Sequence, residues 1–318
     1  MNTRALAVGA ALIMGVLGAL NEESLAADKK VAIMWHGKST MQKRITSAFF
    51  WRCKEIAPNL AVTVKREIPT AEEAEKIFWE YEKTMDGIVY LRSFGAEFLA
   101  KVNTRIPLFI GGCNDPRDLG VIRNLEAPEG NITGVTYHIP FDKRFQVIRA
   151  LFPLVKRIGI VLQKDHPVAM IDGSGTRDQC GKLGIEYREI VPKDRAELEK
   201  AAYAVAQEVD LIIVSNCVLA FDNVTAILPA ANKRNIPLFS YAEKAVPLGA
   251  TAGISASDEK MGRMLADSVV DVVVNGKRIS QVPVKMDPDP RILINQAMIQ
   301  FLRLTFPDDI MKKADIIK

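Results

Sequence analysis

Short apolar runs alternate with longer amphipathic stretches from Lys29 to the end of the chain. The runs are rich in β-branched residues and apolar on successive positions, which predicts strands buried on both faces. The predicted strands are Val31–Trp35, Ala61–Glu67, Gly87–Leu91, Pro107–Gly112, Ile132–Tyr137, Arg157–Gln163, Ile185–Val191, Leu211–Ser215, Pro237–Ser240 and Thr251–Ile254. The stretches between them predict helices, among them Ser39–Ala57, Ala71–Met85, Phe141–Leu151, Ala196–Glu208 and Asp222–Asn235. Such alternation predicts an α/β fold with parallel sheets covered by helices on both sides.

The alternation breaks once, in a long connection from Cys113 to Asn131 that contains two prolines and two glycines. A strand then follows without a helix before it. Two lobes of about 100 residues each fit this break better than one sheet of ten strands.

The proline-rich tail from Val282 to Asn295 reads as extended chain that crosses back between the lobes, and a helix at Asn295–Leu304 follows it. We therefore expect an N-terminal lobe of residues 28–135 and 256–283. The C-terminal lobe would be residues 136–255 and 284–318.

The first residues have the composition of a secretory signal. Met1–Arg4 carries one positive charge, and Ala5 to Leu20 is an uninterrupted apolar run. A polar segment and the small-residue stretch Ser24–Ala27 follow. This pattern predicts a signal peptide of residues 1–27, cleaved near Ala26 or Ala27, and a periplasmic protein. An uncleaved anchor is the alternative, although the apolar run is short for a membrane-spanning helix.

Composition excludes several classes of protein. Of the 318 residues, 48% are hydrophobic and 25% charged, which excludes a disordered or fibrous chain. A net charge of +4 is too small to indicate a nucleic-acid partner. The three histidines and four cysteines lack metal-ligand spacing, and there is no phosphate-binding glycine motif, so we expect no metal and no cofactor. We interpret Gly173–Thr176, a glycine-rich segment, as a helix interruption.

Candidate ligand-binding residues follow the predicted strands, because ligands of open α/β sheets bind beyond the carboxyl ends of the strands. Two lobes would bring two such edges together in a cleft. Ser93 and Asn114 either bind a ligand or cap the helices after them, and Arg92 either pairs with an acidic ligand or points to solvent. Glu243 is the favoured polar contact of the second lobe. The candidates are Trp35, His36, Ser93, Phe94, Cys113, Asn114, Ser215, Asn216, Tyr241 and Glu243.

The cysteines leave three interpretations open. Cys53, Cys113, Cys180 and Cys217 could pair in an oxidising compartment or serve as small buried hydrophobes. Cys113 and Cys217 also follow strands of opposite lobes, the layout of a two-cysteine, cofactor-independent racemase, in which one thiolate removes a proton and the opposing thiol returns one.

Several segments, in order along the chain, resemble one known family. They are Asn114-Asp115-Pro116, Gly130–Val135, Leu151-Phe152-Pro153 before Lys156–Ile160, Asn235–Phe239, Gly249-Ala250, Gly262-Arg263, Pro283-Val284 and Ile294-Asn295. Together they resemble the type I periplasmic binding proteins of ABC transporters, in the group that includes tryptophan- and tyrosine-binding members. The resemblance implies two lobes, three hinge crossings, closure on a small ligand and delivery to a membrane permease. It implies no enzymatic activity, and we expect a monomer.

The chain departs from this family at the site. In members built for amino acids we expect acidic residues beside the second-lobe strands, to bind the ligand ammonium. The matching positions here are Asn216 or Cys217, Ala242 and Ser257, with Glu243 and Asp258 one residue away. A buried ammonium without a carboxylate is costly. An amino acid thus remains one expected ligand, and a neutral, aromatic or apolar molecule suits Trp35, Phe94, Phe221 and Tyr241 equally. A ligand sensor or cargo carrier of the same fold is the alternative function.

Overall fold

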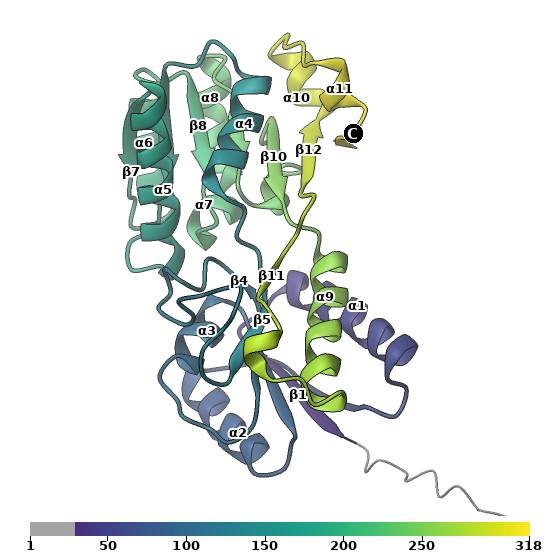
Figure 1. Ribbon diagram of the computed structural model, residues 1–318. Helices are drawn as coiled ribbons and strands as arrows, with labels where there is room; N and C mark the ends of the chain where they lie inside the picture. The colour runs from purple at the N-terminus through teal and green to yellow at the C-terminus, as the bar shows by residue number, and fades with distance from the viewer. Residues whose placement is uncertain (1–28) are drawn as a thin grey trace, which may run out of the picture.

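The computed structural model describes residues 29–318, so the predicted signal peptide, 1–27, lies outside the described residues. The strands form two sheets, one in each of two lobes that lie one above the other in Figure 1. All ten predicted strands are present, with ends within two residues of those expected. The α/β fold with two parallel-sheet lobes is confirmed.

The first lobe contains a parallel sheet with the strand order β11-β5-β4-β3-β1-β2. Its strands are β1 (Lys30–His36), β2 (Ala61–Ile68), β3 (Gly87–Leu91), β4 (Leu108–Cys113), β5 (Ile132–Thr136) and β11 (Lys285–Met286). Its helices are α1 (Thr40–Ile56), α2 (Ala71–Glu82), α3 (Ser93–Leu99) and α9 (Asp258–Val269), followed by a π-helical turn at Val270–Val274 and a 3₁₀ turn at Ile279–Gln281.

The second lobe has the strand order β13-β12-β10-β9-β8-β6-β7, parallel except between β10 and β12. Its strands are β6 (Arg157–Val161), β7 (Glu186–Ile190), β8 (Leu211–Val214), β9 (Leu238–Ser240), β10 (Ala252–Ser255), β12 (Arg291–Asn295) and β13 (Asp315–Ile317). Its helices are α4 (Phe141–Leu151), α5 (Pro167–Leu183), α6 (Arg195–Val205), α7 (Val218–Asp222), α8 (Val224–Lys233), α10 (Gln296–Phe301) and α11 (Asp308–Met311), with a 3₁₀ turn at Glu243–Ala245.

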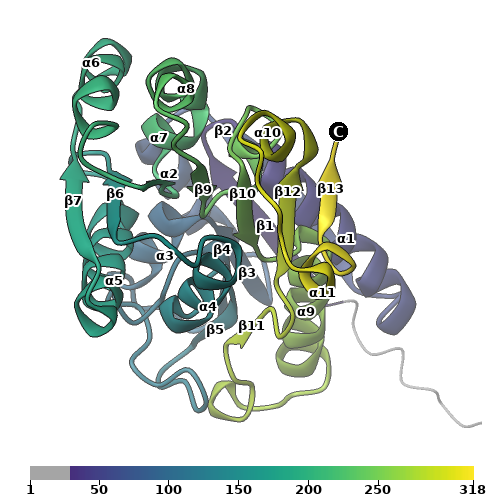
Figure 2. The same cartoon turned by 90° about the horizontal axis from the view of Figure 1, so that it is seen from above.

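Each sheet is buried on both faces because its strands are apolar on both faces. In the first lobe, α1 and α9 cover one face and α2 and α3 the other. In the second lobe, α6 and α8 cover one face, and α4 and α5 the other (Figure 2). The four hydrophobic clusters that result hold both sheets rigid, so the strand ends that face the opposite lobe are fixed in place.

Three segments cross between the lobes, as the resemblance implies (Figure 1). They lead from β5 to α4, from β10 to α9 and from β11 to β12. The proline-rich tail supplies the third crossing. Strand β11 still pairs with β5 of the first sheet, so this crossing follows Met286 rather than residue 283.

One prediction about local structure was wrong. Gly173–Thr176 does not interrupt a helix but lies within α5. A Cβ atom at Gly175 would lie 2.2 Å from the ring of Phe141 on α4. The glycine therefore allows α4 and α5 to approach closely, which outweighs its low helix propensity.

Candidate functional site

Aromatic rings from both lobes meet where the strand ends face each other. Phe94, in the first turn of α3, is 40% exposed. Its ring centroid lies 5.6 Å from that of His36 at the end of β1, and 6.1 Å from that of His166 in the second lobe. His166 caps the N-terminus of α5. These three residues, which we call the aromatic cluster, form a wall built from both lobes.

Arg92 lies beside this cluster, between β3 and α3. Its backbone angles, φ 77° and ψ 164°, fall in a region that is almost restricted to glycine. The backbone is held there because its N–H donates to the carbonyl of Gly111, at 2.8 Å. The guanidinium Nη1 donates to the carbonyl oxygen of His36, also at 2.8 Å.

The charge of Arg92 affects the neighbouring histidines. Burial is the main cause that lowers the pKa of His36, and the positive charge of Arg92 lowers it further. The pKa of His166 is lowered for the same two reasons, although Asp172 opposes the shift. Both imidazoles are therefore neutral at pH 7. Burial also lowers the pKa of Arg92, but a guanidinium stays protonated at this pH.

The polar groups of the first-lobe wall bind one another. The backbone N–H of Asn114 donates to Ser93 Oγ at 3.2 Å, and Asn114 Oδ1 accepts the N–H of Asp115 at 3.0 Å. Asp115 in turn forms an ion pair with Arg117 at 2.5 Å. These contacts fix the loop after β4 and bring Ser93 and Asn114 together, as their positions after neighbouring strands predict.

A buried ion pair lies behind the second-lobe wall. Arg144 of α4 is 2% exposed and Asp172 of α5 is fully buried, with Arg144 Nη1 3.2 Å from Asp172 Oδ1. The other carboxylate oxygen of Asp172 accepts the backbone N–H of Asn216, at 2.8 Å. The guanidinium of Arg144 also packs over the rings of Phe141 and Tyr241, 4.4 and 4.3 Å from their centroids. Asp172 therefore positions the end of β8 while its charge is neutralised.

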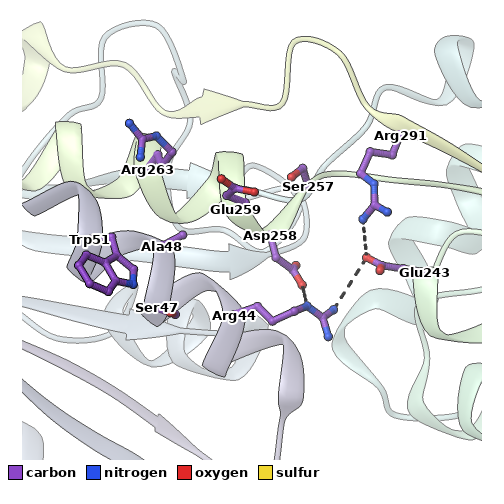
Figure 3. A pocket seen from close by; sticks show the side chains of 10 residues that line it. All are labelled: Arg44, Ser47, Ala48, Trp51, Glu243, Ser257, Asp258, Glu259, Arg263 and Arg291. Atoms are coloured by element: carbon purple, nitrogen blue, oxygen red, sulfur yellow. Dashed lines mark hydrogen bonds and ion pairs between the residues drawn. The ribbon is translucent and has the colours of Figure 1, made fainter. Parts of the chain in front are cut away.

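A charged groove of about 640 Å³ opens where α1 and α9 of the first lobe face Glu243 and Arg291 of the second (Figure 3). Arg44 of α1 lies 2.5 Å from Asp258 in its own lobe and 3.8 Å from Glu243 in the second lobe. Glu243 also pairs with Arg291, at 3.4 Å. The groove is lined by Arg44, Ser47, Ala48, Trp51, Glu243, Ser257, Asp258, Glu259, Arg263 and Arg291.

Several predicted site residues lie in the core instead. Trp35, Cys113 and Ser215 are each at most 1% exposed. Ser215 Oγ donates to the carbonyl of Val161, and Tyr241 bonds to Thr176 inside α5. All four cysteines are unpaired and buried.

The buried thiols of Cys113 and Cys217 are protonated at neutral pH. Burial raises the pKa of Cys113 and Cys217 to about 12, so neither forms a thiolate at neutral pH. Among residues 29–318 there is no group of three acidic, cysteine or histidine side chains that could hold a metal ion. Within the same residues, no helix is both long and apolar enough to cross a membrane.

Five residues of these sites were not predicted from the sequence: His166, Arg144, Asp172, Arg44 and Arg291. His166 lies between the end of β6 and the start of α5. Its position after a strand end could have identified it as a candidate. The charged residues lie within helices or at the start of a strand outside the predicted set, where charges usually face solvent. No local pattern marks them.

Two parallel-sheet lobes that face each other across three crossings define the class of two-lobed α/β binding proteins. The sequence profile of the family described as "ABC transporter substrate binding protein" matches residues 72–318. The chain therefore belongs to the ABC transporter substrate-binding protein family, and it is a substrate-binding protein rather than an enzyme. The two-cysteine racemase alternative is set aside.

Similar proteins agree with this assignment. The chain is 24% identical over 238 residues to a tyrosine-binding protein of Clostridioides difficile strain R20291, covering 75% of this chain and 68% of that protein. A solved structure from Streptococcus pneumoniae, an ABC domain in complex with L-Trp, is 18% identical to this chain and superposes with a TM-score of 0.78. The match covers 92% of this chain and 100% of that one. A conserved domain protein from Vibrio cholerae is 22% identical with a TM-score of 0.77 and the same coverage.

Proposed function

We propose that this protein is exported, closes its two lobes on a small organic ligand with an aromatic or apolar group, and delivers that ligand to an ABC-type permease. The observation that carries this proposal is the contact between Phe94 and His166, whose rings come from opposite lobes and lie 6.1 Å apart. Aromatic rings attract one another and other apolar groups at centroid distances of about 4.5–7 Å.

A ligand at this position would touch both lobes at once. Because such a ligand binds the closed arrangement better than the open one, it shifts the equilibrium towards closure. A permease that recognises the closed form would then distinguish loaded from empty protein. Membership of the ABC transporter substrate-binding protein family supports this delivery role. The tyrosine-binding relative and the structure in complex with L-Trp support an aromatic ligand.

The experiment measures the melting temperature of the purified protein with and without aromatic compounds, neutral and charged. A ligand at 100 times its Kd stabilises the folded state by about 2.7 kcal/mol, which raises the Tm by a few degrees. Phe94→Ala should weaken binding about tenfold or more, because the ligand loses an aromatic contact. Phe301→Ala is the matched control, since Phe301 is an exposed phenylalanine at the end of α10.

The proposal fails if no aromatic or apolar compound raises the Tm, or if Phe94→Ala and Phe301→Ala have equal effects on binding. Delivery is tested in cells. Deletion of the gene should reduce uptake of the compound that binds, and unchanged uptake would contradict the transport role.

A further inference from the structure

We propose that Arg92 binds an anionic group of the ligand, and that the ligand class is aromatic or apolar carboxylic acids that lack an ammonium group. This inference rests on the proposed function and deepens it, because it names the charge that the aromatic site accepts.

Arg92 is placed to bind an anion beside the aromatic cluster. Its Nη1 donates to the backbone carbonyl of His36, whose ring contacts the ring of Phe94. A guanidinium has five N–H donors, and the hydrogen bond to His36 uses a single one of them. Within residues 29–318, Arg92 has no carboxylate within ion-pair distance. A half-buried arginine without an anion is expected to bind one that arrives from solvent.

The carboxylates of the lobe interface are already paired with arginines, except Glu72, an exposed residue of α2 whose charge acts on His36. Asp172 pairs with Arg144, and Asp115 with Arg117. Arg44 pairs with both Glu243 and Asp258, and Glu243 also pairs with Arg291. Asp258 further accepts a hydrogen bond from Tyr137. A ligand ammonium would have to break one of these pairs or rely on the exposed Glu72, where water screens the charge, whereas a ligand carboxylate finds Arg92 without an ion pair.

The neighbouring histidines do not compete for the anion or repel it. His36 and His166 are neutral at pH 7, as described above, so the guanidinium is the positive group beside Phe94 at this pH. Arg92 affects the pKa of His36 more than the opposing charge of Glu72 does, so the local charge favours an anion. A zwitterionic amino acid would gain from Arg92 but would bury its ammonium without a carboxylate partner.

The backbone of Arg92 supports a binding role. A non-glycine residue at φ 77° and ψ 164° is strained, and strained residues persist where the surrounding structure fixes them, often at ligand sites. Glycine at this position would fit the backbone without strain. The arginine thus places its side chain next to the aromatic cluster even though its backbone is strained.

The experiment compares four indole compounds by isothermal titration: indole-3-acetate, 3-methylindole, tryptophan and tryptamine. The protein should bind indole-3-acetate most tightly and tryptamine most weakly. Arg92→Met should weaken indole-3-acetate binding about 10- to 100-fold, because it removes charge-assisted hydrogen bonds, and leave 3-methylindole binding unchanged. Arg92→Lys should retain part of the preference for the acid.

Two controls separate binding from folding. Arg92→Gly removes the same charge and relieves the backbone, so its ligand-free Tm should not fall while acid binding is lost. Arg123→Met makes the same change of net charge at an exposed loop position and should leave all four affinities unchanged.

The outcomes are distinguishable. If aromatic compounds bind but tryptamine or tryptophan binds as well as the acid, or if Arg92→Met keeps the preference for the acid, this inference is overturned and the proposed function stands. If no indole compound or other aromatic or apolar compound binds, the proposed function fails and this inference fails with it.

Discussion

Arg144 and Asp172 are the two charged residues whose burial most constrains the second lobe. A charge in the interior is tolerated only with a partner, and each of these two is the other's partner. We predict that Asp172→Asn destabilises the protein by about 3–5 kcal/mol, because it leaves the guanidinium uncompensated. Urea unfolding of the variant and the parent measures the difference.

The control is an ion pair of the same type at the surface. Arg188 and Glu208 lie 3.7 Å apart and are 60% and 62% exposed. Glu208→Gln should change stability by about 0–1 kcal/mol, because water screens the pair. Equal effects of the two substitutions would contradict the role given to the buried pair.

His138, at the first crossing between the lobes, makes stability depend on pH. It is buried, its Nδ1 has no partner among the described residues, and burial lowers its pKa from 6.5 to about 4. The unfolded chain therefore binds a proton near pH 6.5, while the folded protein binds it only near pH 4. Stability that is fully present above pH 6.5 is lost as the pH falls from there towards 4.

We predict that this single group removes about 2–3 kcal/mol of stability between pH 7.5 and pH 4.5. Urea unfolding at the two pH values measures the loss, and His138→Gln should reduce it by that amount because glutamine does not titrate. An identical loss in parent and variant would show that other groups cause the acid sensitivity.

At the scale of elements, helices α1 and α9 pack most closely at Gly262. A Cβ atom there would lie 2.4 Å from the carbonyl oxygen of Ile45 and 2.7 Å from Cβ of Ala48. Gly262→Ala should therefore separate the helices and cost about 1–3 kcal/mol, in spite of the higher helix propensity of alanine.

Gly181 of α5 provides the matched comparison, because a Cβ atom there has no neighbour within 4 Å. Gly181→Ala should stabilise the protein by up to about 1 kcal/mol. Close packing at Gly262 is supported if urea unfolding shows a lower free energy of unfolding for Gly262→Ala and a higher one for Gly181→Ala. A stabilising Gly262→Ala would be evidence against it.

The elements themselves were largely predictable. Strands such as Gly87–Leu91 are short, apolar and β-branched, so local pattern alone identifies them. Helix α5 was missed in part because Gly175 allows a close contact with Phe141, which lies on another helix. Strand β12 has two prolines shortly before it, and its pairing with β10 depends on the chain crossing back to the second lobe. Contacts between distant segments decide both cases.

At the scale of the whole molecule, Glu243 links the lobes through Arg44 (Figure 3). Arg44 is also held by Asp258 within the first lobe, so loss of Glu243 removes the link between the lobes and leaves the arginine paired. We predict that Glu243→Gln shifts the protein towards more open conformations by a factor of less than about five, because partly exposed pairs contribute about 0–1 kcal/mol.

Small-angle X-ray scattering measures this shift as an increase in the radius of gyration. Since salt screens such pairs, the radius of the parent protein should rise with ionic strength and that of the variant should change less. Glu259→Gln is the control, because Glu259 lines the same groove without an ion pair among the described residues. A radius that is the same in Glu243→Gln and Glu259→Gln would contradict the prediction.

The site was less predictable than the fold. His36 ends strand β1 and Phe94 comes three residues after β3, so the rule for parallel sheets places them at the lobe interface. Trp35 is equally close to a strand end but points into the core with α1 and α9. The partners of Asp172 and Glu243 lie on other elements and, for Glu243, in the other lobe as well, so their pairing depends on how the elements are assembled.

The order of the three crossings has a consequence for synthesis of the chain. The core of the first lobe combines β1, β3 and β4 with Met261, Leu265 and Val269 of α9, which come after most of the second lobe. One apolar face of the first sheet is thus covered by α1 alone on the ribosome, from Thr136 until α9 has emerged. The central strands of the second lobe, β6 to β10, are complete earlier. Neither lobe is therefore complete until the end of synthesis: the first waits for α9 and β11, and the second waits for β12 and β13.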